Sequence, residues 1–311
     1  EMRESDWSSD VCSSDLNTDL SVYLDHFPAK GETVKGHSFR TGAGGKGLNQ
    51  AIAAAKLGGR VHFLGAVGKD AFGEMMLSKL KEAGVDVSSV SVREDIASGV
   101  ALIEVCQGEN EIALDLGANE TITESEIEAF LEKAKPGDLF LTQGENNGDS
   151  LRESLQKARE LGLRSLLNPA PANKTMKDDF PFVDYLLPNE TEVALLSGIE
   201  DLEKAAKSLA VPTVVVTLGE KGYAVFSKKE SYSQSALKVK AVDTTGAGDA
   251  FCGAFAAFLS QDLEDKEALR LSSIYASLKT TRKGSSIAML TQKEFKDYLM
   301  KNEVALASLL H

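Results

Sequence analysis

The stretch DTTGAGDAF, residues 243–251, decides the fold of this chain because it joins two segments of different character. Residues 237–242 before it predict a strand, and residues 249–260 predict an apolar helix. Glycines allow the backbone to turn tightly and to approach a ligand. Amides at the start of a helix point at one spot, where the helix dipole favours an anion. We therefore expect an anion site at this junction of strand, turn and helix.

Asp249 in this stretch does not suit a pure anion site, because a carboxylate repels phosphate. The carboxylate is useful if it takes a proton from an attacking hydroxyl while the amides of residues 246–248 hold the developing phosphoryl charge. The same residues also fit a simple glycine turn in which Asp249 caps the helix. The motif alone leaves both interpretations open.

A second glycine-rich stretch, GAGGKGLNQ at residues 42–50, also opens a predicted helix. It is not a Walker A loop, because Gly47 follows Lys46 where that motif has Ser or Thr. Asn49 stands in the first turn of the helix, where its amide can both donate to and accept from a hydroxylated ligand. The alternative is a flexible loop.

Two weaker motifs follow predicted strands. In NETE, residues 189–192, Asn189 and Glu192 lie on one helical face and could order a hydrated Mg²⁺, which prefers oxygen ligands. A capped helix start explains the same residues. TLGEKG, residues 217–222, is a turn that could line a nucleotide.

The order of elements predicts an α/β fold. Predicted strands cover residues 61–67, 139–143, 165–168, 184–187 and 214–217, and predicted helices cover residues 48–57, 72–83, 151–161, 190–196, 249–260 and 266–281. Strands that alternate with helices predict a parallel sheet covered on both faces. The stretches 20–27, 33–40, 99–106 and 111–116 pair instead as hairpins, which predicts a small β flap beside the sheet.

The composition excludes several classes of protein. The net charge of −13 disfavours nucleic-acid binding, which requires basic surfaces. No apolar run reaches the roughly 18 residues of a membrane span. Neither the three cysteines nor the four histidines have zinc-ligand spacing, and sparse cysteines suit a reducing compartment. We expect a cytoplasmic protein without nucleic-acid or membrane partners.

The first residues, EMRESDWSSDVCSSDL at 1–16, differ from the rest of the chain. They have no apolar core and no basic start, so they are not a secretory signal. Residues 5–16 resemble a translated sequencing adapter, which predicts a foreign segment fused to a gene that has lost its start. A disordered natural tail is the alternative. A foreign segment would put polar residues into a central strand, which conflicts with the apolar runs of strands buried on both faces.

Together the motifs resemble the ribokinase family of carbohydrate kinases over residues 17–311. GGKGLNQA at residues 44–51, with glycines at 65, 68 and 73, resembles the first family signature, and residues 243–251 resemble the second. NPAP at 168–171 and PNETE at 188–192 are similar to further family blocks. The resemblance implies one ribokinase-like domain with a three-layer α/β/α fold, a mostly parallel central sheet and a small β-sheet lid at about residues 20–40 and 99–116.

The resemblance also implies the site. The implied sugar-binding residues are Asn17, Asp19, Gly45, Lys46, Asn49, Glu145 and Asp249. The implied general base is Asp249, with the anion hole at Gly246, Ala247 and Gly248. The implied nucleotide-binding residues are Asn189, Thr217, Gly219, Glu220, Gly222 and Gly248, with Glu192 acting on Mg²⁺ indirectly. The implied monovalent-cation site consists of Asp243, Thr245, Lys279, Arg282 and Gly284.

The reaction implied is the ATP-dependent phosphorylation of D-ribose to ribose 5-phosphate, with Mg²⁺ and an activating K⁺, by a homodimer paired through the lid. The alternatives are a sister kinase of fructose, another ketose or a nucleoside, a non-catalytic sugar- or nucleotide-binding protein of the same fold, or a chain whose foreign first strand prevents folding. Two positions depart from the family pattern. Ser14-Asp15-Leu16 replaces the Gly-Ser-Ile that precedes Asn17, and Ala288 replaces a serine of the cation loop.

Overall fold

The computed structural model describes residues 10–13, 15–107, 109–145 and 147–310, with side chains from residue 15 onward. The strands are β1 (Asp10–Ser13), β2 (Asn17–Leu24), β3 (Ser38–Gly44), β4 (Val61–Gly68), β5 (Asp86–Arg93), β6 (Gly99–Cys106), β7 (Glu109–Asp115), β8 (Leu139–Gln143), β9 (Arg164–Asn168), β10 (Tyr185–Leu186), β11 (Thr213–Thr217), β12 (Tyr223–Ser227) and β13 (Ser231–Gln234). The α-helices are α1 (Lys46–Lys56), α2 (Ala71–Glu82), α3 (Glu124–Leu131), α4 (Gly148–Glu160), α5 (Glu190–Ser197), α6 (Leu202–Ser208), α7 (Ala247–Ser260), α8 (Asp265–Lys279), α9 (Gln292–Asn302) and α10 (Val304–Ala307).

The central sheet has the order β13-β12-β11-β10-β9-β8-β1-β4-β5. All pairs from β11 to β5 are parallel, whereas β12 and β13 are antiparallel to their neighbours. The prediction of a mostly parallel sheet is therefore confirmed. Since the carboxyl ends of parallel strands lie at one edge, this topology brings the loops after β8, β9 and β11 to the same side of the molecule.

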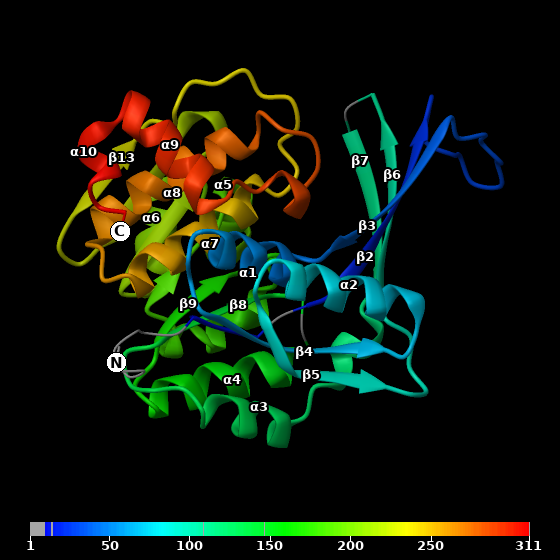
Figure 1. The fold of residues 1–311 in the computed structure, drawn as a ribbon, viewed down its shortest axis with the longest axis horizontal. Coiled ribbons are helices and arrows are strands. Elements are labelled where there is room, and N and C mark those ends of the chain that lie inside the picture. Colours follow the sequence, from blue (N-terminus) through cyan, green and yellow to red (C-terminus); the bar gives the residue numbers. More distant parts are fainter. Residues whose placement is uncertain (1–9, 14, 108, 146, 311) are drawn as a thin grey trace.

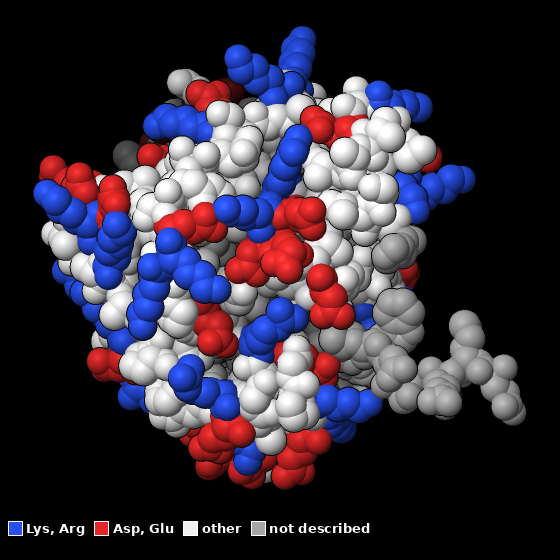
Figure 2. All heavy atoms as spheres, turned by 90° about the vertical axis from the view of Figure 1, so that its left-hand side faces the viewer, with Lys and Arg blue, Asp and Glu red and all other residues white. Residues whose placement is uncertain are grey.

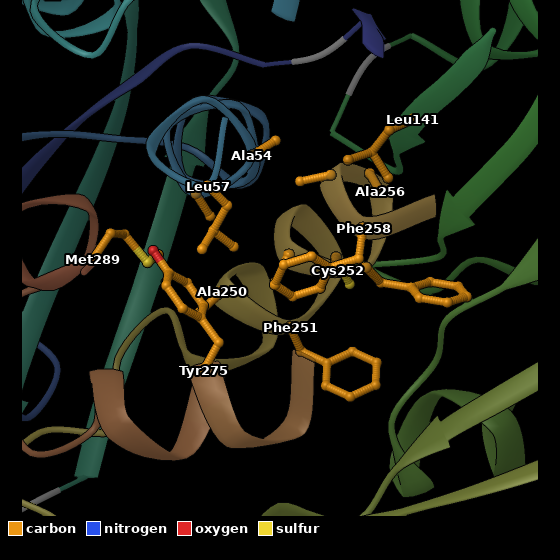
Figure 3. Close-up of a cluster of buried hydrophobic side chains, with 14 of the residues drawn as sticks. Ala54, Leu57, Leu141, Ala250, Phe251, Cys252, Ala256, Phe258, Tyr275 and Met289 are labelled. Carbon is orange, nitrogen blue, oxygen red and sulfur yellow. The ribbon is translucent and has the colours of Figure 1, made fainter. Parts of the chain in front are cut away.

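Two helical layers cover the sheet (Figure 1). One core packs α1, α7, α8 and α9 on the first face, and the other packs α3, α4, α5 and α6 on the second. Figure 3 shows Ala250 of α7 close to Leu57, which follows α1, and to Tyr275 of α8. Helix α7 is apolar all round because it lies between the sheet and these helices, and this burial fixes its first turn in place.

A second, four-stranded sheet of order β3-β2-β6-β7 forms the lid. In Figure 1 it projects from one side of the α/β body. Strand β2 is antiparallel to β3 and parallel to β6, and β6 and β7 form the predicted hairpin. The small β-sheet lid expected from the resemblance is therefore present, and it starts at Asn17, directly beside the central sheet.

Two predicted strands are wrong. The strand predicted at residues 33–40 lies at Ser38–Gly44 instead, because the chain from residue 25 to 37 is a loop. Residues 237–242 form no strand, and several of them line a pocket in front of α7. Their apolar side chains cover this pocket rather than a sheet. The alternation of apolar and polar residues is the same in both settings, and it therefore led to the wrong prediction of a strand.

The N-terminal segment contributes to the central sheet. Strand β1 pairs with β4 and β8 in the middle of the sheet, and a disordered tail is therefore wrong for residues 10–13. Leu16 is fully buried in the first core. Residues 1–9 and 14 lie outside the described residues, and the foreign origin of residues 1–16 stays a prediction.

The surface carries both signs of charge. Figure 2 shows acidic and basic side chains interspersed over the face on the left of Figure 1, without a broad basic area. Within the described ranges, no helix has the length and apolar character needed to cross a bilayer.

Candidate active site

Asp249 lies in the first turn of α7, at the start of the apolar helix. Its carboxylate accepts one hydrogen bond from the Asn49 side-chain amide at 2.9 Å and one from the Gln50 side-chain amide at 3.1 Å. Both donors stand in the first turns of α1, so the two glycine-rich stretches meet at this carboxylate. A carboxylate has lone pairs to spare beyond these two bonds, and it can therefore still accept a proton from a ligand.

Burial raises the pKa of Asp249, although the charge of Lys46 and the amides of Gln50 and Asn49 oppose the shift. A raised pKa makes a carboxylate a stronger base, which is the direction that proton abstraction from an alcohol requires. Asn49 also carries a buried side-chain oxygen, Oδ1, that has no hydrogen-bond partner among the described residues. A buried unpaired acceptor is costly, so this oxygen marks a position for a ligand hydroxyl.

The turn before α7 presents main-chain amides beside Asp249. Gly246 has a φ of 72°, a left-handed conformation that glycine adopts readily. In the described part of the chain, the amides of Gly246, Gly248 and Asp249 find no hydrogen-bond acceptor, whereas the Ala247 amide donates to the Thr244 carbonyl at 3.1 Å. The amides of Gly246, Gly248 and Asp249 are therefore the ones available to a ligand at the turn where an anion hole is predicted.

Asp15, Asp19, Glu145 and Asp249, together with Lys46, form what we call the acidic cluster. The pKa of the Asp19 carboxyl is raised to about 6, first by burial and then by the charges of Asp15 and Asp249. The pKa of Glu145 is also raised, by burial and by its contact with Asp15. Too many carboxylates share one half-buried space, so some of them hold protons.

The charge of Lys46 lowers the pKa of Asp19, of Glu145 and of Asp249 against the effect of burial. Its ammonium lies 3.7 Å from Glu145 Oε1. Burial alone would lower the pKa of Lys46, but the charges of Asp249 and Glu145 raise it above its usual value. Lys46 therefore stays charged among the carboxylates of the acidic cluster.

The side chain of Asn17, the first residue of β2, links the lid to the acidic cluster. Its side-chain amide donates to Asp15 at 2.9 Å and to Glu145 at 3.2 Å, and its side-chain oxygen accepts from Asn119 at 3.1 Å. Asn119 is fully buried and also bonds the main chain of Leu16 in both directions. This network fixes where the chain passes from β1 of the central sheet to β2 of the lid, and hence where Asp19 lies.

Asp15 closes the start of α1. Gly45 has a φ of 94° and provides no side-chain cap, and the Asp15 carboxylate accepts from the amides of Lys46 at 3.1 Å and Gly47 at 2.9 Å instead. A carboxylate at a helix N-terminus is favourable. The same charge crowds Asp19 and Glu145, so Asp15 stabilises the helix and strains the acidic cluster.

A cavity of about 660 Å³ lies on the other side of the Gly246–Gly248 turn, and we call it the large pocket. This volume is typical of a site for a nucleotide-sized ligand. Its walls come from the turn after β11, the chain before α7, and helices α7 and α8. The lining residues are Thr217, Gly219, Glu220, Lys221, Gly222, Ala236, Leu237, Lys238, Val239, Ala241, Thr244, Ala247, Gly248, Phe251, Ser273, Ala276, Ser277 and Thr280.

The predicted nucleotide residues are thus largely brought together: Thr217, Gly219, Glu220, Gly222 and Gly248 all line the large pocket. Asn189 does not line it, and instead pairs with Thr217 as a β-bridge at its edge. Asn189 and Glu192 form a reciprocal capping box at the start of α5, with bonds of 2.8 Å in each direction. The geometry of Asn189 and Glu192 is therefore that of a capped helix start, the alternative given for residues 189–192 from the sequence.

Glu192 nevertheless faces the site. Burial raises its pKa, while the charge of Lys46 lowers it and that of Asp249 raises it. The capping box uses its Oε2 atom, which leaves Oε1 for a water on a metal ion. One such carboxylate fits a Mg²⁺ ion that keeps most of its waters and is bound chiefly by phosphates.

The five residues predicted around a monovalent cation differ in their contacts, and they do not all face one point. The Asp243 carboxylate accepts from the amides of Thr245 at 3.0 Å and Gly284 at 2.9 Å, which ties the two loops. The Arg282 side chain turns away to Glu294 at 3.0 Å. The Lys279 ammonium reaches between the loops and donates to the carbonyl oxygens of Thr245 and Asp243.

Sequence reasoning missed several residues of this site, including Asp15. Gln50 stands within a quoted motif but received no role. Asn119, Ser273 and Ala276 carry no local motif, and only the tertiary packing of the η1 turn (Gly117–Thr121) and of α8 brings them here. The signal that could have identified Asn119 is a polar residue in a segment expected to be buried, outside any predicted helix cap.

Known proteins resemble this chain over most of its length. A sequence model of the pfkB family of carbohydrate kinases matches residues 9–292. The ribokinase of Schizosaccharomyces pombe is 38% identical over 92% of this chain and 97% of its own. A deoxyribokinase of Salmonella typhi is 34% identical over 92% of this chain and 96% of its own. The structure of an Arabidopsis thaliana ribokinase complexed with ribose and ATP is similar at a TM-score of 0.85 and 30% identity, and covers 94% of this chain and 99% of that one.

Proposed function

Because this chain belongs to the pfkB family of carbohydrate kinases, and is an ATP-dependent sugar kinase with a ribokinase-like fold, we propose that it converts D-ribose to ribose 5-phosphate. One observation carries the proposal. Asp249 is held by Asn49 and Gln50 at a point where the acidic cluster and the large pocket meet across three unpaired amides.

The sugar lies against the acidic cluster under the lid, with its primary hydroxyl at Asp249. The unpaired Oδ1 of Asn49 accepts from a sugar hydroxyl. Asn17, Asp19 and Glu145 supply further polar contacts, and main-chain turns at Gly45 allow close approach. Fixing the hydroxyl in this way supplies much of the rate acceleration through orientation.

ATP lies in the large pocket with its γ-phosphate at the amides of Gly246, Gly248 and Asp249. Asp249 removes the proton of the hydroxyl as the new bond to phosphorus forms, and the amides and Lys46 stabilise the charge on the migrating group. Mg²⁺ bound to the phosphates would neutralise their charge, with Glu192 ordering its waters.

Two sugars fit the comparisons. Ribokinases and a deoxyribokinase are similar to this chain at nearly equal identity. We favour ribose because the acidic cluster is rich in buried polar groups. A sugar that lacks a hydroxyl leaves a partner unpaired, which costs about 1–3 kcal/mol.

The lid supports a dimer. Val22 pairs with Phe39, and Leu20 pairs with Leu102, so these apolar side chains share one face of the small sheet. Phe39 and Leu102 are more than half exposed. We propose that two copies of the chain pair through this face, which buries the exposed side chains. The cytoplasmic location stays a prediction.

The test is a substrate panel with ATP. We expect kcat/KM to be highest for D-ribose and at least roughly tenfold lower for 2-deoxy-D-ribose, D-fructose and adenosine, because each of the latter leaves a buried polar group unpaired or misplaced. A higher kcat/KM for any of the three would overturn ribose as the substrate. If none of the sugars stimulates ATP consumption, a non-catalytic binding protein of the same fold is favoured instead.

A further inference from the structure

Lys279 occupies an unusual place for a lysine. It is the last residue of α8 and is fully buried, although lysines are rarely buried without a partner. Its ammonium donates to the carbonyl oxygen of Thr245 and, at 3.3 Å, to that of Asp243. Both carbonyls belong to the turn that presents the Gly246 and Gly248 amides.

These carbonyls are the oxygens that a monovalent cation would use if this chain had the cation site that its family resemblance implies. The residues do not fit such an ion. A second positive charge at the same two oxygens would meet the Lys279 ammonium at short range, which is unfavourable in a buried space. Ala288, in the facing loop, is buried and offers no side-chain oxygen as a ligand.

An ammonium group resembles K⁺ in charge and in size, and it differs in donating hydrogen bonds along its N–H directions. Placed on the Thr245 and Asp243 carbonyls, it supplies a fixed positive charge directly behind the anion-binding turn. It also orients these peptide groups, because each carbonyl that points toward a cation turns its own amide the other way. Asp243 then joins the turn to Gly284 through its side chain.

We propose that the side chain of Lys279 takes the place of the activating monovalent cation, so that this kinase works without K⁺. Lys279 is a positioning residue, since it touches the turn and not the reacting atoms. The activity part of this inference rests on the proposed kinase function.

The experiment compares the wild type with Lys279→Ala and Lys279→Met in choline chloride and in KCl at equal ionic strength, with ATP and D-ribose. We expect the wild-type kcat to change by less than about twofold between the salts. We expect Lys279→Ala to lose at least about tenfold in choline chloride, because the turn loses its counter-charge, and to regain much of this loss in KCl as K⁺ enters the vacated space.

Lys279→Met keeps the volume and removes the charge, so it separates packing from charge if the alanine variant folds poorly. Lys266→Ala, at the exposed start of the same helix, is the matched control and should behave as the wild type in both salts.

Thermal melting gives a readout that does not depend on catalysis. The melting temperature of the wild type should be the same in both salts, whereas that of Lys279→Ala should rise in KCl. Strong activation or stabilisation of the wild type by K⁺ would overturn the proposal, and so would variants that keep the wild-type rate and melting temperature in choline chloride. If no sugar is phosphorylated in either salt, the proposed function fails, and the melting comparison alone decides the role of Lys279.

Discussion

The acidic cluster and the large pocket lie on opposite sides of one glycine turn, and they are formed by different types of residue. The acidic cluster consists of charged side chains that come from the segment before β2, from β2 itself, from α1, from the loop after β8 and from the first turn of α7. The large pocket is lined mainly by glycines, small side chains and main chain. One side therefore depends on a balance of charges, and the other on shape.

This difference teaches which changes each side can tolerate. Charge substitutions in the acidic cluster act on several pKa values at once, because Asp15, Asp19, Glu145 and Asp249 influence one another. Substitutions in the large pocket act locally, through volume. Asp249 belongs to both sides, because its carboxylate lies in the acidic cluster and its amide in the glycine turn.

The largest effect is expected for Asp249→Asn. The variant should lose about 10²–10⁴-fold in kcat, because the amide cannot take the proton of the sugar hydroxyl. Binding of ribose and of ATP, measured separately by calorimetry, should stay close to the wild type.

Asp262→Asn is the matched control for this variant. It removes an exposed carboxylate just beyond the other end of α7, at a φ of 59° that asparagine tolerates. A wild-type kcat in Asp249→Asn would remove the residue from the role of base.

The next effect is expected for Ala276→Phe, which fills the large pocket from α8. Overpacking of this size costs about 1–3 kcal/mol, or roughly fivefold to 150-fold in the KM for ATP. The KM for ribose should not change, since the acidic cluster lies beyond the glycine turn. Ala276→Ser is the control, and equal changes in both KM values would show that the two sides are not separate.

A smaller effect is expected for Asp15→Ser, which removes one charge from the acidic cluster. The pKa values of Asp19 and Glu145, two of the proposed sugar contacts, should fall. The KM for ribose should fall with them by roughly threefold to tenfold, because a shift of one pKa unit corresponds to about 1.4 kcal/mol. Steady-state kinetics between pH 5 and about 8 measure this change. A higher KM at every pH would show that Asp15 serves the sugar directly.

The same variant changes the dependence of stability on pH. Asp19 has a folded-state pKa of about 6 against an ordinary value of 3.8, so its protonation stabilises the fold fully below pH 3.8, and this contribution is lost as the pH rises to about 6. Relieving the crowding should make the melting temperature of Asp15→Ser fall less than that of the wild type over this window. Loss of the helix cap, about 0.5–2 kcal/mol, should lower its stability at the acidic end.

The smallest effect on catalysis is expected for Leu102→Glu on the outer face of the lid. A charge at this exposed position should convert the proposed dimer to a monomer in light scattering, because like charges would face each other across the interface. The kcat should fall only a few-fold, since the acidic cluster is complete within one chain. Met300→Glu, which replaces an equally exposed apolar residue on α9, should leave the oligomeric state unchanged.

The sequence predicted the α/β alternation, the lid and the start of α7 because glycine turns and apolar runs are local signals. It did not predict that residues 237–242 cover a pocket, since their alternation is the same in either setting. The contacts of Gln50, Asn119 and Lys279 depend on how α1, η1 and α8 pack in three dimensions. Asp15 is the clearest case, because its effect comes from carboxylates far away in sequence.

The most direct measurement follows labelled phosphate from ATP. The account predicts that the wild type transfers the γ-phosphate of ATP to the primary hydroxyl of D-ribose, and that Asp249→Asn does so far more slowly while both substrates remain bound. Label released only as inorganic phosphate, or transferred equally well by the variant, would contradict the account.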